Sequence, residues 1–99
     1  MAATILNVKA FNALKDQQEL EGLRSQQLAL IPVLDRVGLF DLFQPMDWLR
    51  DNEGRTWIGV LYFHVFPEKM DEQVQKRLID VSQTASPLLR EEMHKLLGI

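Results

Sequence analysis

The chain contains no cysteine. This absence excludes disulfide bonds, thiolate nucleophiles and zinc sites with cysteine ligands. A chain without thiols is suited to a reducing compartment, so we expect a cytoplasmic protein. The opening residues, from Met1 to Asn7, contain no basic residue and no apolar run as long as that of a secretory signal, which agrees with this expectation.

A long hydrophobic run is also missing. The longest apolar stretch extends from Trp57 to Phe66 and is interrupted by His64. A helix that crosses a bilayer needs about 20 mostly apolar residues. We therefore expect no membrane-spanning segment and no membrane partner.

Positive charge is not in excess. The chain has 11 Lys and Arg residues against 14 Asp and Glu residues, and the net charge of −3 is spread over both halves. A protein that holds nucleic acid needs several cations on one face. The cations between Lys69 and Lys95 alternate with acids, which argues against a helix-turn-helix DNA-binding module. We expect a small acidic protein without a nucleic-acid partner.

Signatures of metal and cofactor sites are absent as well. A metallopeptidase helix needs two histidines one turn apart, whereas His64 and His94 are far apart in the sequence. Gly54 stands alone in its charged turn, and a phosphate-binding loop needs several glycines followed by a lysine or a helix N-terminus. We expect no metal and no cofactor.

The composition itself is that of a globular protein. Of the 99 residues, 46% are hydrophobic and 25% are charged. A chain of this length is able to bury about 65% of its surface in one core. We predict a single globular domain over residues 1–99.

Apolar residues at helical spacing predict a mainly α fold of four to five helices. The predicted segments are residues 7–31, 32–43, 68–84 and 86–97, with one further helical turn at 45–50. The first segment is either one long helix or two shorter helices that meet around Asp16–Glu21. Pro32 either kinks a helix or begins one, and we predict that it begins one.

One central strand or short hairpin is predicted at about residues 55–66, which makes the fold α+β if the strand finds a neighbour. The segment is rich in β-branched and aromatic residues, and both faces of the strand are apolar. The same strand of a second copy is one neighbour that satisfies its hydrogen bonds, so we expect a homodimer. The alternative is a buried helix over Trp57–Val65, with Trp57, Leu61 and His64 on one side; we favour the strand.

Large apolar residues also gather outside this segment. They occupy four of the five positions of Leu39–Phe43, more than one helix is able to bury against one neighbour. This cluster indicates either a helix buried on all sides or an interface. Trp48 and Trp57 flank the charged turn Asp51–Gly54, and tryptophan is frequent both in cores and at binding hot spots.

These features predict a non-catalytic protein-binding module, such as an adaptor, an inhibitor or an assembly factor, that also self-associates. A protein partner would bury an aromatic patch, and an acidic rim would steer it. The predicted residues are Phe40, Phe43, Trp48 and Trp57 in the patch, and Asp47, Asp51 and Glu53 in the rim.

The alternative, from another class, is a small oligomeric enzyme or ligand-binding protein with a pocket around His64 and Tyr62. A histidine among apolar residues is able to act as a general base. The plainer interpretation is a histidine bonded to the backbone, because no hydroxyl or acid stands at a spacing that indicates a relay. We therefore predict no catalytic residue and favour the binding module.

Overall fold

The computed structural model of the chain describes residues 2–13, 17–42, 44–49 and 52–99. The elements are α1 (Ala2–Asn12), α2 (Gln17–Arg36), α3 (Leu39–Leu42), η1 (Pro45–Trp48), α4 (Glu53–Val65), η2 (Pro67–Lys69), α5 (Glu72–Thr84) and α6 (Pro87–Leu97), where η marks a 3-10 helix. The described residues contain six α-helices and no strand. The mainly α prediction is confirmed, and the predicted number of helices is too low. None of these helices combines the length and the apolar character needed to cross a membrane.

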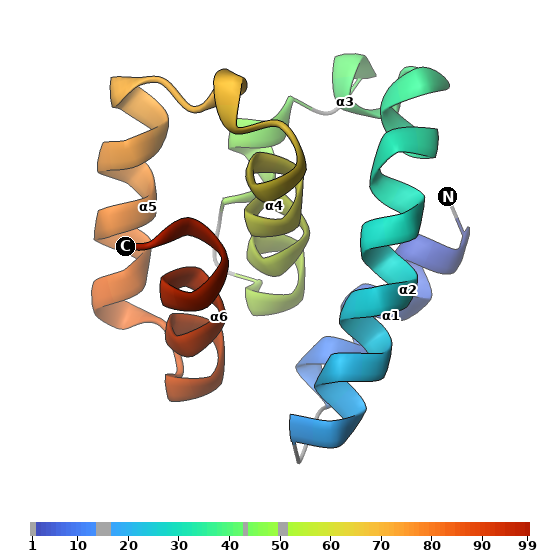
Figure 1. The fold of residues 1–99 in the computed structure, drawn as a ribbon, viewed down its shortest axis with the longest axis horizontal. Coiled ribbons are helices and arrows are strands. Elements are labelled where there is room, and N and C mark those ends of the chain that lie inside the picture. Colours follow the sequence, from blue (N-terminus) through green and yellow to red (C-terminus); the bar gives the residue numbers. More distant parts are fainter. Residues whose placement is uncertain (1, 14–16, 43, 50–51) are drawn as a thin grey trace.

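Helix α4 lies at the centre of the fold. Figure 1 shows it between α5 and α6 on one side and α1 and α2 on the other. Every residue from Thr56 to Phe63 is buried. A helix that is apolar on all sides is stable only when other elements surround it. Here α1, α2, α6 and η1 all pack against α4.

The strand or hairpin predicted at residues 55–66 is wrong, because these residues belong to α4. Asn52 caps the helix, and its Oδ1 atom accepts a hydrogen bond from the Arg55 backbone N–H at 3.2 Å. The cap and the acidic Glu53 in the first turn favour a helix start at the place where a chain reversal was expected. A strand at this position also has no neighbouring strand among the described residues to bond with.

The alternative of a buried helix over Trp57–Val65 is confirmed in its main point. Trp57 and Leu61 are both buried, as that alternative requires. His64 differs from the prediction, since its ring is exposed. The reason is its place near the end of α4, where its Nδ1 atom lies 3.0 Å from the Leu96 carbonyl oxygen at the end of α6.

Two separate helices form the N-terminal part. Helix α1 ends at Asn12 and α2 begins at Gln17, so the two-helix alternative is correct. The prediction that a helix begins at Pro32 is wrong, because α2 continues through Pro32 to Arg36. Pro32 lies on the exposed side of α2, so its ring meets solvent and not the packed face of the helix.

The apolar cluster Leu39–Phe43 follows a break in the helix. Gly38 has a φ of +87°, a left-handed conformation that favours glycine and ends the preceding helix. In the short helix α3, Leu39 and Phe40 are buried and Leu42 is 80% exposed. Phe43 lies outside the described residues. The helix predicted over residues 32–43 is therefore divided at Gly38.

Helix α5 confirms the predicted end and corrects the predicted start. It ends at Thr84 but begins at Glu72, after the 3-10 helix η2. Asp71 is the capping residue, and its Oδ1 atom accepts a hydrogen bond from the Val74 backbone N–H at 2.9 Å. This cap fixes the start of the helix four residues after the predicted one.

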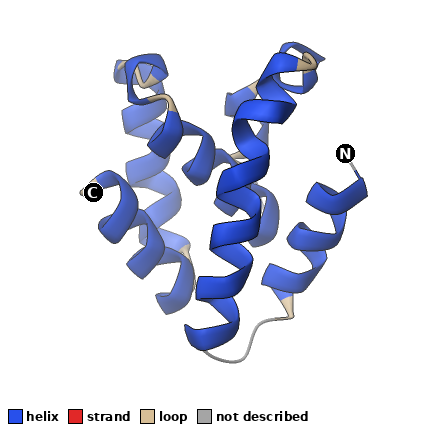
Figure 2. Cartoon of the chain, turned by 45° about the vertical axis from the view of Figure 1, so that its right-hand side comes forward, coloured by secondary structure: helices blue, strands red, loops and turns tan. Residues whose placement is uncertain are grey.

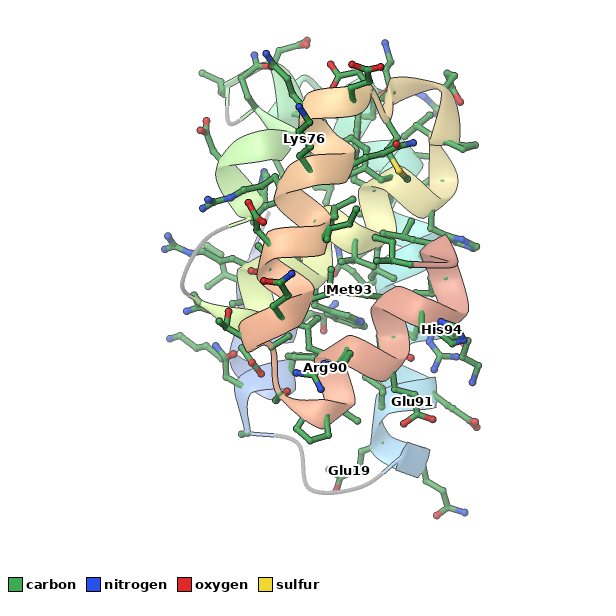
Figure 3. All side chains as sticks on the ribbon, turned by 90° about the vertical axis from the view of Figure 1, so that its left-hand side faces the viewer. Glu19, Lys76, Arg90, Glu91, Met93 and His94 are labelled. Carbon is green, nitrogen blue, oxygen red and sulfur yellow. The ribbon has the colours of Figure 1, made fainter. Side chains whose placement is uncertain are left out.

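Helix α6 begins and ends as its sequence predicts. Ser86 caps it by accepting a hydrogen bond from the Leu89 backbone N–H at 3.3 Å, and Gly98 ends it with a φ of +72°. Figure 3 shows Met93 directed into the molecule between α5 and α6, whereas His94 lies on the outer side of α6. The helix thus presents its apolar side to the core.

A buried polar cluster joins three helices. The Glu92 carboxylate of α6 accepts hydrogen bonds from Arg24 of α2, from Nε at 2.9 Å and from Nη2 at 2.8 Å. It also accepts a hydrogen bond at 3.2 Å from the indole Nε1 of Trp57 in α4. The hydrogen bonds with Glu92 raise the pKa of the Arg24 guanidinium above its ordinary value, against the opposing effect of burial.

Tyr62 forms the centre of an aromatic cluster. Its ring centroid lies 4.5 Å from that of Phe40, 5.2 Å from that of Phe63 and 5.1 Å from that of Phe66. Burial raises the pKa of the Tyr62 hydroxyl above its ordinary value, and nearby carboxylates, first that of Asp35, raise it further. The folded protein therefore favours the neutral tyrosine.

We expect Tyr62→Phe to make the protein less sensitive to alkaline pH. Above about pH 10 the unfolded chain loses a proton that the folded chain retains, so wild-type stability falls as pH rises toward the folded pKa. Tyr62 is the single tyrosine of the chain, so its ionisation is seen directly in the tyrosinate absorbance. Urea unfolding at about pH 8 and about pH 11 measures the difference between the two proteins. Equal losses of stability in both proteins would contradict this account.

Candidate functional site

A groove lies between α1 on one side and η1 and the start of α4 on the other. Its volume is about 520 Å³, within the range of about 300–1,000 Å³ that is usual for binding pockets. We call it the α1–η1 groove. Its lining residues are Thr4, Ile5, Val8, Lys9 and Asn12 of α1, Leu39 of α3, Asp47 and Trp48 of η1, and Asn52 and Arg55 at the start of α4.

The apolar part of the groove includes the aromatic side chain of Trp48, which packs against Phe40. Trp48 is half-buried, and its ring centroid lies 6.0 Å from that of the buried Phe40. Ile5 lines the groove from α1 and is 50% exposed, and Leu39 adds a buried apolar side chain. A side chain that is already positioned loses less conformational entropy when a ligand binds. The groove therefore offers a prepared apolar contact surface.

The polar end of the groove is fixed by asparagine side chains. Asn12 accepts a hydrogen bond from the Gly54 backbone N–H at 2.8 Å, and its Nδ2 atom donates to Asn52 Oδ1 at 2.9 Å. Asn52 is also the cap of α4. These bonds fasten the end of α1 to the start of α4. The two sides of the groove are therefore fixed relative to each other at this end.

The rim of the groove carries charges of both signs. Lys9, Asp47 and Arg55 line it, and all three are exposed. The predicted acidic rim is represented by Asp47 alone among the described residues. Glu53 has another role, since its Oε2 atom accepts a hydrogen bond at 2.8 Å from the Ser86 backbone N–H at the start of α6. Asp51 lies outside the described residues.

The predicted aromatic patch is divided between the core and the groove. Trp57 is fully buried, and its ring stacks on Phe11 of α1 with centroids 4.8 Å apart. Phe40 is buried behind Trp48, and Phe43 lies outside the described residues. Of the predicted patch and rim, the structure thus brings Trp48 and Asp47 together at an accessible surface.

The structure does not bring together His64 and Tyr62, the two residues of the alternative pocket. Residues two apart on a helix point in different directions, and these two side chains have separate surroundings. Tyr62 is buried among Phe40, Phe63 and Phe66, whereas His64 is exposed beside the end of α6. The part of the chain that the structure describes also contains no group of three or more His, Asp or Glu side chains that is placed to hold a metal ion.

Sequence reasoning missed the α1 side of the groove. Ile5, Lys9 and Asn12 stand three to four residues apart, a spacing that places them on one helix face. That spacing was available in the sequence. The missing information was the position of η1 opposite this face, because it depends on the packing of α1 against α4, far along the chain.

Similarity to known proteins covers the first four helices. Residues 1–66 match the family described as "Domain of unknown function (DUF7709)". The match includes the α1–η1 groove and stops one residue after the end of α4. No curated protein and no solved structure matches the chain.

Proposed function

We propose a protein-binding function for this chain, which belongs to the DUF7709 family. It acts as a non-catalytic module, such as an adaptor, an inhibitor or an assembly factor. Its partner docks in the α1–η1 groove. The observation that carries this proposal is Trp48, half-buried at the wall of an apolar groove of about 520 Å³ and supported from behind by Phe40.

The residue types in the groove favour a protein partner over catalysis. Tryptophan and arginine are the types most enriched at protein-binding hot spots, and the groove contains Trp48 and Arg55. The amides of Asn12 and Asn52 are engaged in joining α1 to α4. No histidine lines the groove, so the usual general base is missing from it.

The shape and charge of the groove define the partner more closely. From Ile5 to Asn12 the wall formed by α1 is about 10 Å long, which is two helical turns. An amphipathic helix is a common ligand for a groove of this kind. Lys9 and Arg55 at the rim favour acidic residues beside the apolar face of that helix, and Asp47 favours one basic residue.

The absence of cysteine supports a cytoplasmic location for this function. Proteins in a reducing compartment are held together without disulfide bonds. In this protein, hydrogen bonds and apolar packing join the helices. We propose the cytoplasm as the place where the partner is met.

A photo-crosslinking residue tests the groove directly. Placed at Ile5, it is expected to capture a partner from an extract of the source cells. At Ile79 on α5 it captures none, although the two positions are equally exposed, at 50% and 48%. Trp48→Ala removes the apolar anchor and is expected to weaken binding by about 2 kcal/mol or more, which lowers the crosslinking yield from Ile5 about 30-fold at low protein concentration.

Two controls make the result decisive. Circular dichroism of Trp48→Ala shows whether the helices remain intact, and Ile79→Ala is a matched surface truncation outside the groove. Equal capture from positions 5 and 79, or capture that Trp48→Ala leaves unchanged in a folded protein, would remove the proposal.

A further inference from the structure

An exposed apolar stripe follows the outer face of α2. The half-buried Leu30, the exposed Val33 and the exposed Val37, which directly follows the end of α2, are spaced by three and four residues, and this places them in one row. Val33 is 47% exposed and Val37 is 73% exposed. Leu6 of α1, 64% exposed, lies beside the row across a shallow hollow of about 420 Å³ that it shares with Leu30. We call these four residues the α2 stripe.

Half of the large exposed apolar residues of the described chain belong to this surface. Of the six large apolar side chains that are exposed in the described part of the chain, Leu6, Val33 and Val37 belong to the α2 stripe, whereas Ile5 lines the α1–η1 groove and Leu42 and Ile79 lie on α3 and α5. Figure 2 shows α2 along the front of the molecule, with no other described element in front of it. Exposed apolar groups that are collected on one face, and not scattered singly, mark an interaction surface.

We propose that the α2 stripe is covered by the α2 stripe of a second copy of this chain, with the two α2 helices antiparallel about a two-fold axis. The central strand that first indicated a homodimer does not exist, so this surface supplies a different reason for one. The inference does not depend on the α1–η1 groove, which is lined by other residues.

The charges along α2 determine the direction of pairing. Its first turn contains the acidic Glu19, which lies on the side of the stripe, and its last turn contains the basic Arg36 at the edge of the stripe; Glu21 and Asp35 point away from it at 100° per residue. An antiparallel pair places the acidic end of each helix beside the basic end of the other, at both ends of the interface. A parallel pair places like charges together, which is unfavourable. Antiparallel pairing also opposes the two helix dipoles favourably.

The same geometry brings a bulky residue to a glycine. In an antiparallel pair that places Glu19 opposite Arg36 of the second copy, Val33 lies opposite Gly22 of the second copy. Both pairs of positions are centred on the same point of α2, between residues 27 and 28. A Cβ atom added at Gly22 would meet nothing within 4 Å, so the surface beside it is open. Val33 fills this space in the pair, as a ridge fills a groove in helix packing.

Sedimentation equilibrium of the full chain tests the proposal. We expect the wild type to dimerise with increasing concentration, and Val33→Asp to raise the dissociation constant about tenfold or more, since it buries an unpaired carboxylate. Ile79→Asp is the matched control, because Ile79 is 48% exposed and lies on α5, and it leaves dimerisation unchanged. Gly22→Gln, which meets open space in the monomer, weakens the dimer as well and serves as the second variant if Val33→Asp fails to fold.

A charge exchange then tests the direction of pairing. Arg36→Glu alone weakens the dimer, and adding Glu19→Lys in the same chain restores it. A wild type that stays monomeric at all concentrations would overturn the proposal. Equal effects of Val33→Asp and Ile79→Asp, or no restoration by the charge exchange, would do so too.

Discussion

Glu92→Ala is expected to lower the free energy of unfolding by about 3–5 kcal/mol. The Glu92 side chain is only 2% exposed and Arg24 is 15% exposed, so neither is well solvated by water. Without the carboxylate, the Arg24 guanidinium loses both hydrogen bonds at 2.8 and 2.9 Å, and the Trp57 N–H loses its acceptor. Urea unfolding followed by circular dichroism measures the loss.

Two further variants show that the loss comes from the buried pair. Lys95→Ala removes an exposed charge from the same helix and should change stability by less than about 0.5 kcal/mol. Exchanging both Arg24 and Glu92 for methionine should cost less than Glu92→Ala alone, because no charge then stays buried without a partner. A loss below about 1 kcal/mol for Glu92→Ala would show that water replaces the carboxylate.

Gly54→Ala and Gly22→Ala are expected to change stability in opposite directions. A Cβ atom at Gly54 would press on the backbone oxygen of Val8 and come within 2.8 Å of its Cγ1 atom, so α1 must move away from α4. We expect a loss of about 1–3 kcal/mol from this overpacking. At Gly22 the added Cβ meets open space, and alanine should stabilise α2 by about 0.5–1 kcal/mol.

The two glycine variants control for each other. Both replace a helical glycine by alanine, but Gly22 lies in the interior of α2 and Gly54 is the second residue of α4, so the gain in helix propensity is smaller at Gly54. A loss of stability at Gly54 beyond this difference reports its contact with α1. Thermal unfolding at low protein concentration measures both. Stabilisation by Gly54→Ala would show that α1 moves without loss of free energy of unfolding. The close packing of α1 against α4 would then not depend on a glycine.

The central helix shows why composition misled the sequence interpretation. Tryptophan, tyrosine and β-branched residues indicated a strand over 55–66, but these preferences describe residues that fit a buried surface, whether strand or helix. Burial of every residue from Thr56 to Phe63 requires neighbours on all sides. Those neighbours come from α1, α2 and α6, whose positions no local pattern contains. Tertiary packing therefore decided the secondary structure of this segment.

Helix ends were easier to predict, because the atoms that fix them are close in sequence. The cap at Ser86 and the left-handed Gly98 were visible as single residues with known preferences. Asp71 was overlooked as a cap because Pro67 and Glu68, just before it, already indicated the start of a helix.

The candidate site was only half visible in the sequence. Trp48 and Asp47 were predicted, since an aromatic residue beside acids indicated a contact surface. Their partners across the groove lie on α1, and the bond between Asn12 and Asn52 joins residues 40 positions apart. Such a pairing follows from the packed structure and not from a motif. The groove therefore depends on tertiary packing, and only its η1 side, with Asp47 and Trp48, was recognisable in the local sequence.

The different surroundings of the two tryptophans give the protein two separate optical signals. Trp57 is enclosed, stacked on Phe11 and hydrogen-bonded to a carboxylate, so its fluorescence changes when the core opens. Trp48 lines the groove and is half-buried, so its emission responds to whatever displaces water there. Since the chain contains only these two tryptophans, unfolding and groove occupancy are distinguishable by their emission without any attached dye.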